Sequence, residues 1–186
     1  IDMKNSGAIF GILRTRINMD DPNKIIDAYK YAELHLKKEN VDVEVYCELA
    51  SYILDKGSVN DVKNILSRAS ASLKGKDIYP ELDYQYARYH KQLTVYDDER
   101  KYLESAVKKI ERLKERGMGI ARREKGINKL SSKVYNDLGE NYDRMSRANI
   151  KAENMYNKAI DADPTYAKPY YNLGNFAFIN KGKRDE

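Results

Sequence analysis

The sequence contains few of the residues that build cross-linked or metal-bound sites. Its 186 residues include one cysteine, two histidines and no tryptophan. One cysteine excludes an internal disulfide. Together with only two histidines, it leaves too few ligands for a structural zinc site. We therefore expect neither a metal nor another cofactor.

Proline and long apolar runs are also scarce. The chain has four prolines, so long helices are interrupted at few places. No apolar run approaches the roughly 20 residues that a membrane-spanning helix needs, and no signal peptide is recognisable. The single thiol suits the cytoplasm and equally a periplasmic or cell-envelope protein, so the compartment stays open.

Charged residues and tyrosines are abundant, as expected for amphipathic helices. Hydrophobic residues make up 41% of the chain, charged residues 34%, and there are 16 tyrosines. The net charge of +5 is concentrated in residues 108–129, which hold nine basic and three acidic residues. This local excess predicts one basic patch: Lys108, Lys109, Arg112, Lys114, Arg116, Arg122, Arg123 and Lys125.

Small residues recur at regular intervals along the chain. Ala32, Ala69 and Ala106 are spaced 37 residues apart, and Ala50 and Ala87 each lie 19 residues before the later two. A small side chain lets two helix axes approach closely, and large neighbours fill the space beside it. The pattern continues near the end of the chain, where Gly139 lies 20 residues before Ala159 and 35 residues before Gly174. It predicts repeated helical hairpins.

The hydrophobic periodicity and the helix-terminating residues, proline and glycine, predict nine helices. Pro22 and Pro80 suit the first turns of two helices, and Gly57 and Gly75 suit helix ends. The predicted helices span residues 3–17, 22–38, 42–56, 59–74, 80–93, 97–116, 127–145, 149–161 and 167–180.

The last third of the chain resembles the tetratricopeptide repeat family. The residues that carry the resemblance fall in three consecutive predicted helices, with Pro164 just after the second: Tyr135, Leu138, Gly139 and Tyr142; then Ala152, Tyr156, Ala159 and Pro164; then Tyr170, Leu173 and Gly174. The resemblance implies an all-α fold, a right-handed superhelical α-solenoid of about four and a half helical-hairpin repeats. It also implies a concave groove that is lined by the first helix of each hairpin and binds a peptide or a partner protein.

We expect residues 1–186 to form a single array. The interval from Ala87 to Gly139 is 52 residues instead of 37, so about fifteen residues are extra. These residues predict either a lengthened helix pair or solvated loop, or a protruding binding element. The final pattern breaks off at residues 180–186, so we expect the array to continue or the last helix to act as a cap. The expected units are 1–39, 40–76, 77–117, 127–164 and a partial 165–186, with a basic insert at 117–128.

Helix geometry predicts which residues line the groove. Residues three before, one after and five after each small residue share one flank of a helix. This rule selects Cys47, Ser51, Asp55, Tyr84, Arg88, Gln92, Asn136, Glu140, Arg144, Tyr171 and Asn175. The family resemblance adds Asn172. Some family members bind a terminal carboxylate through basic residues beside such asparagines, but the matching positions here are Asn136 and Glu140. We therefore expect an extended peptide to be held through Asn and Tyr.

No catalytic arrangement can be assembled from these residues, so we do not expect an enzyme. The glycine pair in GMGIAR follows a predicted helix, whereas a phosphate loop needs a preceding strand. We expect a non-catalytic scaffold that binds a protein or peptide. Two alternatives stay open: a nucleic-acid or anionic-surface binder using residues 108–129, and a regulatory array of a larger protein. Partner identity and oligomeric state are not specified by the sequence.

Overall fold

The computed structural model describes residues 43–55, 59–73, 79–115, 121–145 and 150–182, without the side chains of 44, 45, 121–125 and 180–182. These residues form seven helices and no strand. The predicted helices at 3–17 and 22–38 lie outside the described residues. The chain divides into two compact units, Ile1–Asp77 and Ile78–Glu186, and each is described by itself.

The first unit contains one described helical hairpin. Helix α3 (Val43–Asp55) packs against α4 (Val62–Ser72). The small residues Ala50 and Ala69 are both fully buried, as expected where two helices approach closely. Helix α4 begins three residues later than predicted, because Val59, Asn60 and Asp61 precede its first helical turn.

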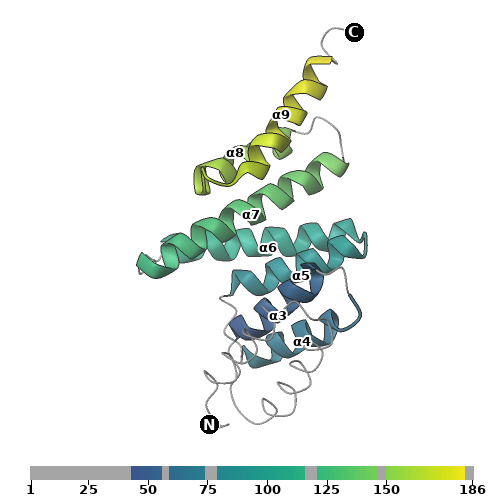
Figure 1. Cartoon of the computed structure of the whole chain (residues 1–186), viewed down its shortest axis with the longest axis vertical. Helices are drawn as coiled ribbons and strands as arrows, with labels where there is room; N and C mark the ends of the chain where they lie inside the picture. The colour runs from purple at the N-terminus through teal and green to yellow at the C-terminus, as the bar shows by residue number, and fades with distance from the viewer. Residues whose placement is uncertain (1–42, 56–58, 74–78, 116–120, 146–149, 183–186) are drawn as a thin grey trace. The chain divides into compact units, whose positions relative to one another are not determined.

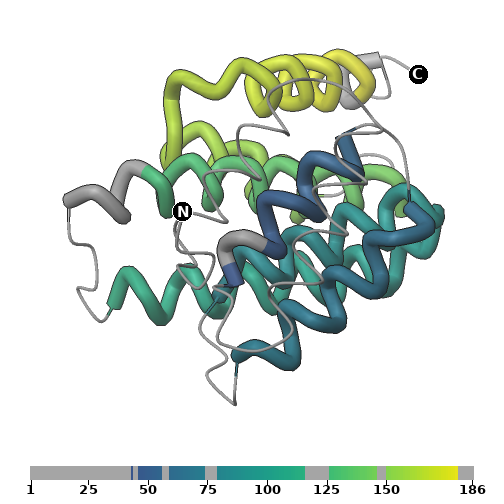
Figure 2. The backbone as a smooth tube through the Cα atoms, turned by 60° about the horizontal axis from the view of Figure 1, so that its bottom comes forward, coloured from purple at the N-terminus to yellow at the C-terminus, as the bar shows by residue number. Residues whose placement is uncertain are grey.

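The second unit contains five helices that pack in chain order. They are α5 (Pro80–Gln92), α6 (Tyr96–Glu115), α7 (Ala121–Met145), α8 (Ile150–Ala162) and α9 (Ala167–Gly182). Figures 1 and 2 both show α7 between α6 and α8, and α7 also contacts α9. Each neighbouring pair therefore buries an apolar stripe that neither helix could bury alone.

Small residues mark the close contacts in this unit. Ala87 and Ala106 are buried in a cluster with Leu103 and Leu138. In the next hairpin, Gly139 lies directly against the ring of Tyr156, so closely that an added Cβ would be 2.6 Å from Cε1 of that ring. Gly139 is therefore required by packing and not by a special backbone angle.

Local signals set the ends of the helices. Pro80 occupies the first turn of α5, and Tyr79 before it is extended, with a φ of −105°. The turn from α5 to α6 contains Thr94 in the left-handed region, with a φ of 59°. After α8, the Asp163 carboxylate accepts hydrogen bonds from the backbone amide and the hydroxyl of Thr165. This turn directs the chain into α9.

Helix α7 starts six residues earlier than predicted, at Ala121. The residues Ala121–Lys125 are good helix formers, and a single interior glycine such as Gly126 costs only about 1 kcal/mol relative to alanine. The second part of the expected insert is therefore helical, whereas residues 116–120 lie outside the described residues.

The all-α fold of repeated helical hairpins is confirmed for the described residues. Among the described residues of the second unit, one hydrophobic cluster lies between α5, α6 and α7 and another between α8 and α9. The right-handed superhelical course, the number of repeats and the single array stay predictions, because the two units are described separately.

Candidate partner-binding site

Helices α5, α7 and α9 meet through charged side chains. The acids Asp137 and Glu140 lie on α7, between a lysine from each neighbour. Lys91 of α5 places Nζ 2.8 Å from Glu140 Oε2 and 3.7 Å from Asp137 Oδ1. Lys168 of α9 places Nζ 2.7 Å from Glu140 Oε1 and 3.6 Å from Asp137 Oδ1. The four charges neutralise one another and connect three helices.

Amide and hydroxyl groups complete this arrangement. Asn172 donates hydrogen bonds to Asn136 Oδ1 at 2.9 Å and to Glu140 Oε1 at 3.0 Å. Asn136 also donates to Glu140 Oε1, at 3.0 Å, and the Tyr84 hydroxyl donates to Asp137 Oδ2 at 3.1 Å. We call the set the polar strip: Tyr84, Lys91, Asn136, Asp137, Glu140, Lys168 and Asn172.

Burial and charge act in opposite directions on the ionisable groups of the polar strip. Burial raises the pKa of Glu140, but Lys91 and Lys168 outweigh it and lower that pKa to about 2. For Lys168, burial lowers the pKa, but the hydrogen bond to Glu140 and the charge of Asp137 outweigh burial and raise that pKa above its ordinary value. Burial and the neighbouring Asp137 raise the pKa of the Tyr84 hydroxyl. At neutral pH, Glu140 and Lys168 are therefore both charged and paired, and the Tyr84 hydroxyl is neutral.

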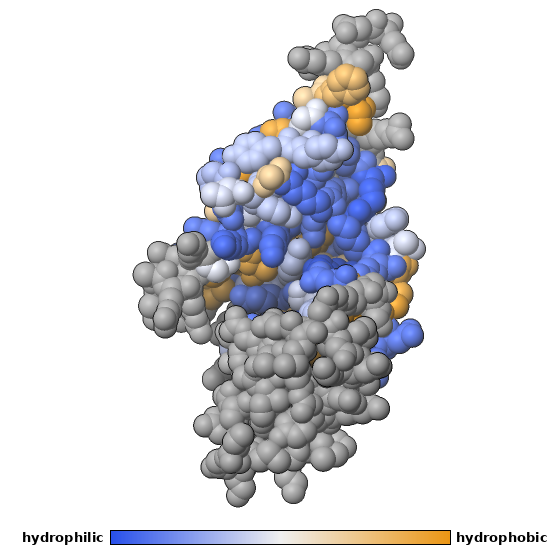
Figure 3. Space-filling model, viewed as in Figure 1, coloured by the Kyte–Doolittle hydropathy of each residue, from blue (hydrophilic) through white to orange (hydrophobic). Residues whose placement is uncertain are grey.

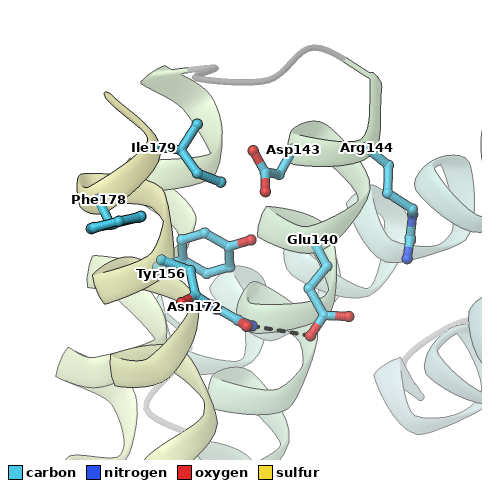
Figure 4. A pocket seen from close by; sticks show the side chains of 8 residues that line it. Glu140, Asp143, Arg144, Tyr156, Asn172, Phe178 and Ile179 are labelled. Carbon is cyan, nitrogen blue, oxygen red and sulfur yellow. Dashed lines mark hydrogen bonds between the residues drawn. The ribbon is translucent and has the colours of Figure 1, made fainter. Parts of the chain in front are cut away.

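A cavity of about 430 Å³ opens beside the polar strip, between α7, α8 and α9. Four of the predicted groove residues line it: Glu140, Arg144, Asn172 and Asn175. Four further residues that the groove prediction did not select also line it: Asp143, Tyr156, Phe178 and Ile179. Figure 4 shows most of these side chains, with the hydrogen bond from Asn172 to Glu140 as a dashed line. Acidic, amide and apolar groups therefore share one cavity.

Hydropathy changes along the visible face of the second unit. In Figure 3, hydrophilic side chains cover much of this face, and hydrophobic side chains gather at the upper end, where α9 lies. Phe178 and Ile179 of α9 are 81% and 41% exposed. The cavity thus adjoins a polar surface on one side and an apolar surface on the other.

The groove prediction was wrong for the residues three positions before Ala50, Ala87 and Gly139. Cys47, Tyr84 and Asn136 are buried, with exposed fractions of 5%, 9% and 0%. Tyr84 of α5 contacts Asp137 of α7, and Asn136 of α7 contacts Asn172 of α9, so neighbouring helices cover these two side chains. They support the groove from within and do not offer a surface to a partner. Tyr171 holds the same position in α9 and is 69% exposed, because the described neighbours of α9 leave it uncovered.

The other predicted groove residues are not gathered in the cavity. Ser51 is half-buried and Asp55 is exposed, both in the first unit. In the second unit, Arg88 donates a hydrogen bond to Gln85 on its own helix, and Gln92 is exposed. These positions stay predictions, because no described contact relates them to the cavity.

The predicted basic patch is only partly at the surface. Lys108, Arg112 and Lys114 are exposed. Lys109 is buried, with Nζ 2.8 Å from Asp83 Oδ2, because it lies on the side of α6 that faces α5. Its assignment to the patch was therefore wrong. The remaining predicted members lie outside the residues whose side chains are described: Arg116, Arg122, Arg123 and Lys125.

Three residues of the polar strip and cavity occupy the same position in the repeat pattern, which the groove prediction did not use. Lys91, Asp143 and Phe178 each lie four residues after a small residue of the repeat pattern. Residues four apart lie on the same face of a helix, so this spacing could have selected them. Lys168 and Asp137 had no comparable signal, because their roles depend on which helices become neighbours.

The described part of the chain contains no cluster of three or more His, Cys, Asp or Glu residues that could hold a metal ion. None of its helices is long and apolar enough to cross a membrane. His90 is half-buried in this part and stacks on Tyr102, with ring centroids 5.3 Å apart.

Comparisons with known proteins agree with this fold. Residues 155–184 match a family model described as a tetratricopeptide repeat. The structure is similar to a crystal structure of MamA protein, with a TM-score of 0.65 and 20% sequence identity, covering 97% of this chain and 84% of that one. No curated protein sequence matches the chain. Residues 155–184 are therefore similar to a tetratricopeptide repeat, and the likeness to the MamA structure supports the same all-α fold of helical hairpins.

Proposed function

We propose that this chain is a non-catalytic scaffold that binds a peptide or a segment of a partner protein beside the polar strip. Tetratricopeptide repeats generally bind proteins or peptides, and one such repeat is matched here. The observation that carries the proposal is the cavity, because four residues predicted for the groove, from two different helices, line it together. The partner would lie over α7 and α9.

The polar strip supports this function by fixing the floor of the site. Glu140 is held by two lysines and two amides, so its carboxylate cannot rotate freely toward solvent. A floor that is already hydrogen-bonded needs little reordering when a ligand arrives, which favours binding. Asn175, which is exposed at the cavity, is free to accept and donate hydrogen bonds to a peptide backbone.

A random library of 12-residue peptides tests the proposal. Peptides selected on the wild-type protein should bind with measurable affinity in fluorescence anisotropy. The substitution Asn175→Arg places a bulky side chain at the cavity and should weaken the binding by at least about tenfold. Asn157→Arg is the matched control, because Asn157 is an exposed asparagine on α8 that does not line the cavity.

Two results of the peptide-library experiment would contradict the proposal. The first is a library from which no peptide binds the folded protein. The second is a set of selected peptides that bind Asn175→Arg as tightly as wild type, since they would occupy another surface. Steep loss of binding with added salt, together with equal binding of heparin, would instead favour the basic segment 108–129.

A further inference from the structure

We infer that the cavity beside the polar strip takes a positively charged side chain, a lysine or an arginine, from the bound partner. This inference rests on the proposed function and specifies the chemistry of the partner. It is carried by the carboxylate of Asp143 and the hydroxyl of Tyr156, two polar groups of the cavity that lack a partner among the described residues.

The charge balance of the cavity leaves one carboxylate unpaired. Glu140 is neutralised by Lys91 and Lys168. Arg144 is neutralised by the buried Glu99, whose two carboxylate oxygens lie 2.8 and 2.7 Å from Nη2. Asp143 makes no ion pair or hydrogen bond with any described residue. The cavity therefore carries an excess of one negative charge, which favours a cationic ligand.

The second polar group is nine-tenths buried and faces the cavity. Tyr156 is only 2% exposed, and its hydroxyl makes no hydrogen bond with a described residue. Figure 4 shows this hydroxyl directed toward the space between Asp143 and Glu140. Burial, and then the charges of these two acids, raises the pKa of Tyr156, so the hydroxyl stays protonated. The hydroxyl oxygen can accept a hydrogen bond in the cavity, so a ligand that donates one finds a partner held in place by the packed ring.

The hydrogen-bonding character of the cavity selects a donor. Asn172 uses its amide group on Asn136 and Glu140, which leaves its carbonyl oxygen to accept. Asp143 and the Tyr156 oxygen accept as well. Ammonium and guanidinium groups carry several donors and no acceptor, so they match this lining. A carboxylate ligand would instead meet the unpaired charge of Asp143.

The apolar part of the cavity suits the rest of such a side chain. Phe178 and Ile179 line the cavity from α9 and are largely uncovered. Lysine and arginine bury their methylene stems on apolar surface while the charged group reaches a polar one. The ring of Phe178 can also attract a cation that lies over its face. We therefore expect a ligand with a basic residue and an aliphatic stem, and not a small cation alone.

Four pentapeptides test this inference: acetyl-Ala-Ala-X-Ala-Ala-amide with X as lysine, arginine, norleucine or glutamate. Each is titrated to 10 mM into the full-length ¹⁵N-labelled chain while amide shifts are recorded. The lysine and arginine peptides should shift amides in residues 140–144 and 172–179. Norleucine has the stem without the charge, so its peptide should bind at least about tenfold more weakly, and the glutamate peptide should cause no shift.

Two variants and one control assign the effect to its groups. Asp143→Asn keeps the shape and should abolish the preference for lysine over norleucine. Tyr156→Phe keeps the ring against Gly139 and should weaken the arginine peptide several-fold. Asp161→Asn removes an exposed acid of α8 that does not line the cavity, and it should leave both results unchanged.

Equal binding of the lysine and norleucine peptides would overturn the inference, as would an unchanged preference in Asp143→Asn or the absence of shifts with all four peptides. The library experiment and the pentapeptide experiment together distinguish failure of the proposed function from failure of this inference. If library peptides are blocked by Asn175→Arg but contain no basic residue, the function stands and this inference fails. If the basic pentapeptides shift the cavity amides but no library peptide binds, the proposed function fails, and the preference of the cavity for a basic side chain is still measured.

Discussion

At the scale of single residues, the glycines of the helices have opposite environments. Gly139 has the Tyr156 ring where its Cβ would be, whereas Gly174 has no heavy atom within 4 Å of that position. Both occupy the same place in the repeat pattern, 35 residues apart. The sequence therefore predicts two equivalent contacts, but in the described structure only Gly139 is in contact with a ring.

This difference predicts opposite effects of the same substitution. Gly139→Ala should lower the free energy of unfolding by about 1–3 kcal/mol, because the buried Tyr156 ring must shift. Gly174→Ala should raise it by about 0.5–1 kcal/mol, because alanine loses less backbone entropy in a helix. Chemical unfolding followed by circular dichroism measures both. Equal destabilisation by the two variants would show that an unseen contact covers Gly174.

At the scale of helices, α7 is the element that connects the second unit. Five of its buried residues are polar: Ser131, Ser132, Asn136, Asp137 and Asn141. Ser132 donates to the Ala159 carbonyl of α8, and Asn141 donates to Glu99 and to the Tyr96 carbonyl of α6. Through the polar strip, α7 also bonds α5 and α9. Such a network specifies which neighbours fit, because any other packing would leave buried polar groups unpaired.

The polar strip predicts a dependence of stability on acid. The pKa of Glu140 falls from an ordinary value of 4.5 to about 2 in the folded chain. Its contribution to stability is therefore complete above pH 4.5 and is lost as the pH falls through 2. The lowering corresponds to on the order of 3 kcal/mol. Urea unfolding at several values between pH 6 and pH 2 should show a smaller acid loss in Glu140→Gln than in wild type.

The exposed Glu111 of α6 provides the control for this experiment. Glu111→Gln should leave the acid profile close to that of wild type, because Glu111 has no part in the polar strip. If Glu140→Gln loses stability between pH 4.5 and pH 2 as steeply as wild type, the two lysines do not hold the Glu140 carboxylate in its ionised form.

At the scale of the whole molecule, the second unit contains its own core and the candidate site. The two hydrophobic clusters described for it consist of residues from α5 to α9. All residues of the polar strip and of the cavity also belong to this unit. The site therefore depends on the packing of five helices.

We predict that a fragment of residues 78–186 folds on its own. It should show helical circular dichroism and one cooperative thermal transition, because both clusters are complete within it. In the same fragment, Leu103→Ala should lower stability by about 2–5 kcal/mol, since Leu103 is 1% exposed. A gradual, non-cooperative melt of the unmodified fragment would show that its core needs residues 1–77.

The sequence by itself determined the helical hairpins of the described residues. Small residues about 19 positions apart identify where paired helices touch, because only a small side chain permits that approach, and Ala50, Ala69, Ala87 and Ala106 are buried accordingly. Spacing along a helix also selected three of the residues that line the cavity, Glu140, Arg144 and Asn175.

Only the tertiary structure decided which groups of the groove are available. Tyr84 and Asn136 share a helix flank with exposed residues, but they are buried in contact with neighbouring helices. The pairing of Lys91 and Lys168 with acids about 50 and 30 positions away along the chain follows from the packing of three helices. Spacing within one helix fixes which residues share a face, and the neighbour that covers this face depends on contacts distant in the sequence.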